Sequence, residues 1–139
     1  STSLEDMKNF DTKYIIGGTA RITEAAKTAL GSGAKRLGGA DRYLTSEMIA
    51  ETFAGGTTPL YNRSAFTSGM DGHLVDALVG SVLQGTRKAP LLLIDGETGP
   101  AVELVGMNFK KDGVEEFEVF GGETVMPDDT ALAVAHAAS

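Results

Sequence analysis

The chain has 139 residues, of which 42% are hydrophobic and 22% are charged. This length is typical of one domain with one hydrophobic core, and the composition is too apolar for a disordered chain. No apolar run reaches the ~18 residues of a membrane span, so we expect no membrane insertion, and the absence of cysteine excludes disulfides and thiolate metal sites.

The net charge of −7 disfavours nonspecific binding to nucleic acid or to an acidic membrane surface. The charges are unevenly placed along the chain. Residues 13–63 carry seven Lys or Arg against four Asp or Glu, a net charge of +3, whereas residues 100–139 carry two against eight, a net charge of −6. These two segments are electrostatically complementary, which favours contact between unlike surfaces.

Strand-like and helix-like patterns alternate from residue 13 onward, with short glycine-rich connections between them. The predicted strands are residues 13–16, 35–37, 60–67, 90–95 and 117–120. The predicted helices are residues 22–30, 43–53, 72–84 and 100–109, and a last helix that begins at Pro127. Thr23 is placed to cap the first helix, and Leu74, Leu78 and Val82 mark the expected buried side of the third.

This strict alternation predicts an α/β fold with a single doubly wound, mostly parallel sheet of about five strands, which is a Rossmann-like arrangement. The continuously apolar segment 90–95 is the expected central strand, because such a strand is covered on both faces. We expect one core that contains Leu92, Leu93, Leu78 and Ile16.

One segment of the sequence echoes another. Residues 14–19 (YIIGGT) resemble residues 118–123 (EVFGGE), with the Gly-Gly pairs 104 positions apart, and each copy leads into a predicted helix. This period indicates a chain that starts with the last strand and helix of one repeat and continues through the next. We therefore predict an N-terminal extension at residues 1–12 and one domain at 13–139, in which residues 13–33 end a preceding repeat and 34–137 form a full one.

Four segments in this order and spacing carry a resemblance to a known family. They are RLGGADRY at residues 36–43, Ser68-Gly69 followed by Asp76-Ala77-Leu78, the leucine strand at 90–93, and the closing VFGG at 119–122. Together they resemble the cell-wall-binding type 2 repeat of Gram-positive surface proteins.

The resemblance implies a Rossmann-like or Toprim-like fold that occurs in groups of three and attaches surface proteins to an anionic wall polymer without catalysis. It implies an extracellular location, at the cell surface or in the cell wall, and binding through grooves between associated modules. As partners we expect the anionic polymer and either neighbouring repeats or further copies in a homo-oligomer, most simply a trimer. We place the residues that bind polymer or contact a neighbouring module in these motifs: Arg36, Asp41, Arg42, Tyr43, Ser68, Gly69, Asp76, Leu92 and Leu93.

These polar motifs allow two interpretations, a structural role or the binding of a ligand. Arg36 and Arg42 flank Asp41, so the three side chains can form a structural network, or the guanidinium groups can bind phosphate or carboxylate. Likewise, the turns at Gly17-Gly18 and Ser68-Gly69 can bind an anion with their amides or serve only the close approach of a strand and a helix.

No catalytic residue, cofactor or metal site is expected. The sequence lacks a Gly-x-Gly-x-x-Gly spacing, a Walker A sequence and the usual hydrolase motifs. Asp71, His73 and Asp76 have no identifiable fourth metal ligand. The alternative function is a Mg²⁺-dependent phosphoryl-transfer enzyme or a small-ligand-binding domain, with Asp95, Glu97 and Asp41 as the acidic residues; the competing interpretation of Asp95 and Glu97 is helix capping.

Overall fold

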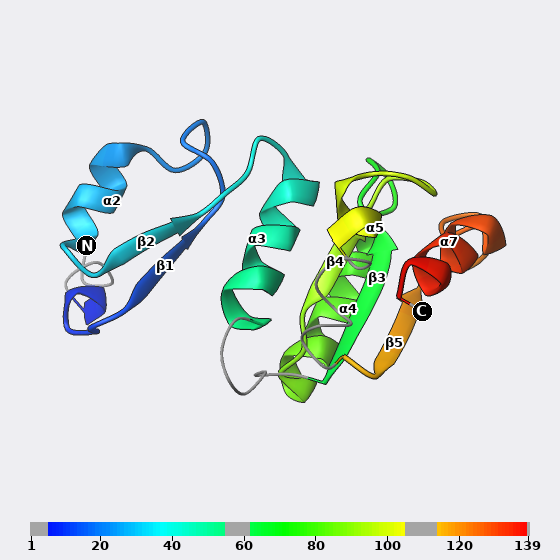
Figure 1. The fold of residues 1–139 in the computed structure, drawn as a ribbon. Helices are drawn as coiled ribbons and strands as arrows, with labels where there is room; N and C mark the ends of the chain where they lie inside the picture. The colour runs from blue at the N-terminus through cyan, green and yellow to red at the C-terminus, as the bar shows by residue number, and fades with distance from the viewer. Residues whose placement is uncertain (1–5, 55–61, 105–113, 139) are drawn as a thin grey trace.

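Strands and helices alternate along the described residues, which are 6–54, 62–104 and 114–138 of this computed structural model (Figure 1). The strands are β1 (Lys13–Ile16), β2 (Ala34–Leu37), β3 (Arg63–Ser68), β4 (Leu91–Ile94) and β5 (Glu116–Phe120). The helices are α2 (Glu24–Leu30), α3 (Arg42–Ala54), α4 (Leu74–Arg87), α5 (Pro100–Leu104) and α7 (Asp128–Ala138). The predicted alternation is confirmed, although parts of the segments predicted at 60–67 and 100–109 lie outside the described residues.

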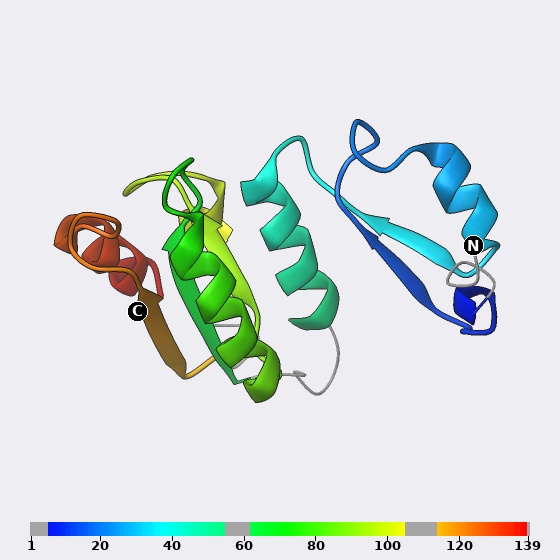
Figure 2. The ribbon, with the colours of Figure 1, turned by 180° about the vertical axis from the view of Figure 1, so that it is seen from behind.

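The strands do not form the single sheet of about five strands that the sequence predicted. They form two parallel sheets, β1-β2 and β4-β3-β5, and α3 follows β2 and leads to the second sheet (Figures 1 and 2). The alternating pattern predicts parallel pairing correctly but does not specify which strands pair, because that choice depends on contacts between distant parts of the chain. The edge-to-face contact of Tyr14 with Phe53, at 5.2 Å between ring centroids, joins β1 to α3.

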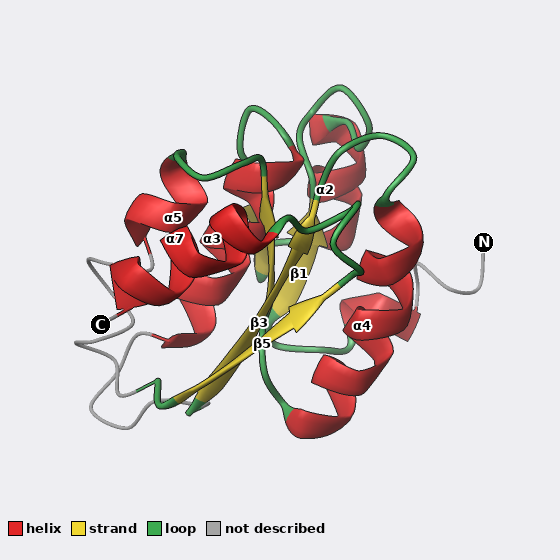
Figure 3. Ribbon diagram, turned by 90° about the vertical axis from the view of Figure 1, so that its right-hand side faces the viewer, coloured by secondary structure: helices red, strands yellow, loops and turns green. Residues whose placement is uncertain are grey.

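Helices cover both faces of the three-stranded sheet. Figure 3 shows α4 on one side of the strands and α3, α5 and α7 on the other. Among the described residues, none of the helices has both the length and the apolar character that a membrane span requires.

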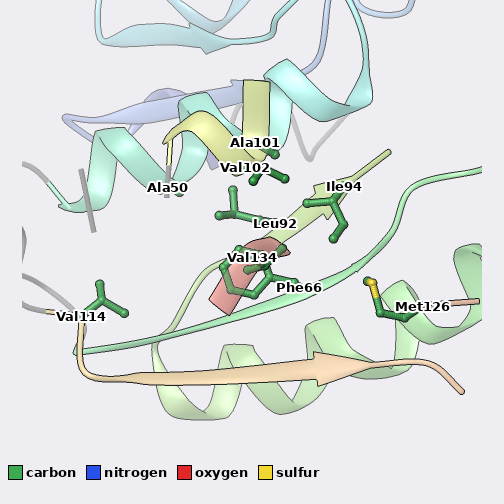
Figure 4. Close-up of a cluster of buried hydrophobic side chains, with 9 residues drawn as sticks. All are labelled: Ala50, Phe66, Leu92, Ile94, Ala101, Val102, Val114, Met126 and Val134. Carbon is green, nitrogen blue, oxygen red and sulfur yellow. The ribbon is translucent and has the colours of Figure 1, made fainter. Parts of the chain in front are cut away.

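The main core lies between the three-stranded sheet and the helices α3, α5 and α7, which cover one of its faces (Figure 4). Its buried side chains are Ala50, Phe66, Leu92, Ile94, Ala101, Val102, Val114, Met126 and Val134. The prediction was right for Leu92, which is fully buried. It was wrong for Leu78 and Ile16, which are 69% and 47% exposed, and Leu93 is only partly buried.

The helix α4 presents the opposite face to the one that the sequence predicted. Its buried residues are Gly80 and Gln84, whereas Leu74, Leu78 and Val82 are exposed. A Cβ atom on Gly80 would lie 2.5 Å from Cδ2 of Phe120, so the absence of a side chain allows the helix to approach β5 closely. The apolar stripe of α4 consequently points away from its own sheet.

Candidate functional site

The carboxyl ends of β3 and β4 collect several of the predicted site residues around the start of α3. Arg42, the first residue of α3, donates through Nη1 to the backbone oxygen of Gly69 at 2.9 Å and to Asp71 Oδ1 at 2.7 Å. The hydrogen bond and the opposite charge of Asp71 raise the pKa of the Arg42 guanidinium, which therefore stays cationic. This contact ties the start of α3 to the loop after β3.

Asp41 caps the amino end of α3. Its Oδ1 accepts a hydrogen bond from the Leu44 amide at 2.9 Å, and Thr45 Oγ1 donates to its backbone oxygen at 2.7 Å. The network that the sequence suggested among Arg36, Asp41 and Arg42 is thus not the one observed, because Arg36 pairs with Glu24 and Arg42 with Asp71. The short Asp41 side chain turns onto the helix amides beside it.

The serine-glycine turn and the tyrosine pack tightly together. Ser68 is buried, and its Oγ accepts from the Met70 amide at 3.3 Å and lies 3.3 Å from Nδ1 of His73. A Cβ atom on Gly69 would lie 2.4 Å from Cε1 of Tyr43, so only glycine fits beneath this ring. Burial, followed by the negative charge of Asp95, raises the pKa of the Tyr43 phenol, which keeps it neutral.

A cavity of about 150 Å³ at this edge is lined by two acidic residues. Asp41 and Asp95 both line it, beside Tyr43 and Thr98. Glu97, the other acidic residue of the magnesium alternative, is not among the lining residues. Within the described part of the chain, no three His, Cys, Asp or Glu side chains are grouped as metal ligands.

The remaining predicted site residues divide between the core and the surface. Leu92 has no exposed area, so it belongs to the core and cannot contact a polymer or a neighbouring module. Leu93 is partly buried, and its amide donates to Ser46 Oγ at 3.1 Å. Asp76, in the first turn of α4, lies near the turn after β5, because its Oδ2 is 3.5 Å from the position of a Cβ atom on Gly121.

Arg36 is separate from the cluster at Arg42. Its Nη1 donates to the Gly17 oxygen and its Nη2 to the Ile22 oxygen, each at 2.8 Å, and its Nε donates to Glu24 Oε1 at 3.1 Å. The side chain is 13% exposed. Arg36 therefore fastens β2 to the turn between β1 and α2, and its donors are directed into the protein.

A groove of about 840 Å³ runs between the β1-β2 end of the molecule and α4. Its walls are largely apolar, with Ile16 on one side and Leu74 and Leu78 on the other, and Arg21 and Arg42 also line it. Neither this groove nor a role for Arg21 was predicted from the sequence. The sequence feature that could have indicated the groove is the number of apolar residues on α4, because this number is larger than one buried stripe requires.

Comparisons with known proteins agree with this architecture. A family model described as cell wall binding domain 2 (CWB2) matches residues 36–136. Cwp6 from Clostridium difficile has a similar structure, with a TM-score of 0.80 and 21% identity over 99% of this chain. Cwp8 from the same organism gives a TM-score of 0.70 and 23% identity over 93% of this chain.

The matched region covers only part of each relative. This chain spans 22% of the Cwp6 chain and 21% of the Cwp8 chain. At these identities the two structures support the fold, and the family model supports family membership. A comparison with curated proteins gave no match.

Proposed function

Because the chain belongs to the cell wall binding domain 2 family, we propose that it is a non-catalytic module that attaches a protein to the cell wall by binding an anionic wall polymer. Membership of this family implies association with the cell surface or wall. The groove is the observation that carries the further step to an anionic polymer, since it combines apolar walls with two cations, Arg21 and Arg42, against one acidic residue, Asp41.

The groove suits a polymer that has both charged and apolar parts. Sugar rings and alkyl segments contact apolar walls, whereas phosphate or carboxylate groups bind guanidinium groups through charge-assisted hydrogen bonds. Arg21 is exposed, and its segment 13–63 carries the net charge of +3. This local charge favours an anionic ligand although the whole chain is acidic.

Cosedimentation with purified Gram-positive cell walls tests this function. The protein should sediment with intact walls and remain in solution after hydrofluoric acid has removed the phosphate-containing polymer. Arg21→Ala should weaken binding about tenfold, because a charge-assisted hydrogen bond contributes on the order of 1.5–3 kcal/mol. Lys27→Ala, which removes the same charge outside the groove, is the matched control. Equal binding to treated and untreated walls would exclude an anionic polymer.

We also propose that modules associate and that the polymer binds in grooves between them; the groove described above is of this kind, since residues 16–21 belong to the predicted end of a preceding repeat and the rest of its lining to the full repeat. The exposed apolar face of α4 supports this step, since Val75, Leu78, Val79 and Val82 are each 67–70% exposed. The complementary net charges of segments 13–63 and 100–139 favour a head-to-tail arrangement of neighbouring repeats or of copies in a trimer.

A further inference from the structure

The turn after β5 repeats the geometry of the turn after β1. We call residues 13–24 the first corner and residues 117–128 the second corner; each consists of a strand, a Gly-Gly turn and a helix start, 104 positions apart. Gly17 and Gly121 have the same φ of +117°, in the region that favours glycine. α2 begins at Glu24 and α7 at Asp128, so both helices start with a carboxylate.

Backbone hydrogen bonds show the same equivalence. Gly18 O accepts from the amides three and four residues later, at 3.2 and 3.1 Å, and Gly122 O accepts from its own pair at 2.8 and 2.9 Å. The first helical hydrogen bonds also correspond, from Lys27 N to Thr23 O and from Ala131 N to Pro127 O. The two corners therefore have one backbone conformation despite little identity outside Gly-Gly.

The first corner binds an arginine. Arg36 on β2 donates to three backbone oxygens and one carboxylate of this corner, and its guanidinium is largely buried there. The equivalent acceptors in the second corner are Gly121 O, Met126 O, Pro127 O and the carboxylate of Asp128. The second corner thus offers the same arrangement of acceptors for a guanidinium group.

Among the described residues, no strand pairs with the outer edge of β5, and this edge corresponds to the side of β1 on which β2 lies. Gly17 N donates to Leu37 O on β2, at 2.8 Å. On β5, Glu116 N donates to Asn62 O, beside β3. Because backbone groups alternate along a strand, the amides of Val119 and Gly121 point to the opposite side, away from β3. β5 is the last strand of its sheet (Figure 1).

Side chains on β5 are more exposed than the equivalent side chains on β1, which has β2 beside it. Ile15, which lies opposite Arg36 in the β1-β2 pair, is 4% exposed. The corresponding residue of β5 is Val119, which is 43% exposed. A strand added to β5 in the register of β2 on β1 would pair with Val119 and cover an edge that otherwise invites pairing.

We propose that the outer edge of β5 and the second corner bind the β2 strand of a following repeat, with the arginine at the position of Arg36 held by Gly121, Met126 and Asp128. This inference deepens the module association in the proposed function and specifies the contact that makes it. The resulting parallel sheet has the order β4-β3-β5-β2, in which the fourth strand comes from the neighbour. The sheet β1-β2 and the sheet β4-β3-β5 of this chain are then two parts of the same kind of four-stranded sheet, which forms again wherever one repeat follows another.

Connection length and charge both favour this occupant. Three residues separate α2 from β2, so a connection of this kind is short. The helix α7 is four residues longer than α2, with 11 residues against 7, so a chain that continues past α7 reaches the edge of β5 after a turn that runs back by about one helical turn. β2 carries Lys35 and Arg36, whereas residues 100–139 have a net charge of −6. Cwp6 and Cwp8, of which this chain spans about a fifth, are long enough for several such repeats.

The test is the full chain extended after Ser139 by a second copy of residues 31–42, which supplies the strand at high effective concentration. Hydrogen exchange should slow at least tenfold at the amides of Val119 and Gly121. The Arg36→Ala change made only in the added copy should remove most of this protection. Asp128→Asn should do the same, whereas Asp129→Asn, with the same charge change one residue later, should not.

Two outcomes would overturn the proposal. One is unchanged exchange at Val119 and Gly121 when the extension is present. The other is protection that Asp128→Asn and Asp129→Asn reduce equally, which would indicate general electrostatic attraction. The experiment contains no polymer, and the cosedimentation experiment uses no extension, so failure of the strand contact and failure of polymer binding are distinguishable.

Discussion

At the scale of single residues, the arginines of the motif around residues 36–43 serve different contacts. Arg36 is largely buried against Gly17, Ile22 and Glu24, whereas the Arg42 side chain is 41% exposed beside Asp71. One arginine therefore joins β2 to the first corner, and the other can face a ligand in the groove while it holds the loop after β3.

Arg36→Ala should lower the free energy of unfolding by about 2–3 kcal/mol, because the partly buried carbonyl oxygens of Gly17 and Ile22 lose a charged donor. Lys35→Ala, on the exposed neighbouring residue, should change it by less than about 0.5 kcal/mol. Urea unfolding of the two variants gives the comparison. Equal effects would show that the hydrogen bonds of Arg36 contribute little.

Glu47 gives a prediction for pH dependence. Its side chain is buried, and Oε1 has no hydrogen-bond partner among the described residues. Burial, and then the negative charges of Glu51, Asp41 and Glu103, raise the pKa of the Glu47 carboxyl above its ordinary value of 4.5. The folded protein consequently holds this proton more tightly than the unfolded chain. The resulting stabilisation is complete below the ordinary value and is lost as pH rises through the folded pKa.

Glu47→Gln should therefore increase the free energy of unfolding at pH 7, by on the order of 1 kcal/mol. The gain should shrink on acidification and vanish below pH ~4, where Glu47 of the unsubstituted protein carries the proton in both the folded and the unfolded state. Urea midpoints measured across this pH range provide the test. A gain that is independent of pH would show that charge at Glu47 is not the cause.

At the scale of elements, apolar residues of β4 contribute to the core, whereas the apolar stripe of α4 does not. Leu92 on β4 is fully buried, and Leu78 on α4 is 69% exposed. Leu92→Ala should destabilise the protein by about 2–5 kcal/mol, whereas Leu78→Ala should cost less than about 1 kcal/mol. Chemical denaturation of both variants distinguishes them, and a shift near zero for Leu92→Ala would contradict its central position.

The face that α4 turns to the sheet can be tested with two of its glycines. Gly80→Ala places a methyl group against Phe120 and should destabilise the protein by about 1–3 kcal/mol. Gly85→Ala meets no atom within 4 Å and should stabilise it by about 0.5–1 kcal/mol, since alanine is the better helix former. Thermal melting of both variants measures the difference. Changes of the same sign would indicate a different orientation of α4.

At the scale of the whole molecule, the two ends of the described chain lie apart, although Arg63, the last residue of the basic segment, pairs with Glu116 of the acidic segment at 2.9 Å. The β1-β2 pair is at one end of the molecule and β5 with α7 is at the other, as Figures 1 and 2 show from opposite sides. Contact between unlike ends of successive copies forms a ring when the rotation closes, and the family resemblance suggests three copies.

We expect concentration-dependent self-association that weakens with salt, because the contact involves net charges of +3 and −6. Light scattering at low and high salt measures the particle mass. A monomer at both salt concentrations and at high protein concentration would exclude the ring for this chain. A trimer that salt does not affect would show that the electrostatic argument is wrong.

The sequence by itself determined the local features of this protein. Thr23 caps α2 as predicted, accepting from the Ala26 amide at 3.3 Å, and the apolar run at Leu91–Ile94 forms β4. The Gly-Gly turns and the motif at residues 36–43 likewise led to the family that the comparisons support. Each of these features depends on neighbouring residues, whose identities fix backbone conformation and hydrogen bonding at short range.

Only the tertiary structure decided which distant groups meet. It divided the strands between two sheets, turned the apolar stripe of α4 outward, and paired Arg36 with Glu24 and Arg42 with Asp71. Periodicity shows that a helix has an apolar side, but the close fit of Gly80 to Phe120 decided which side faces the sheet. Strand partners and arginine contacts depend in the same way on residues far apart in the chain, because the free energy of each pairing depends on how both surfaces pack.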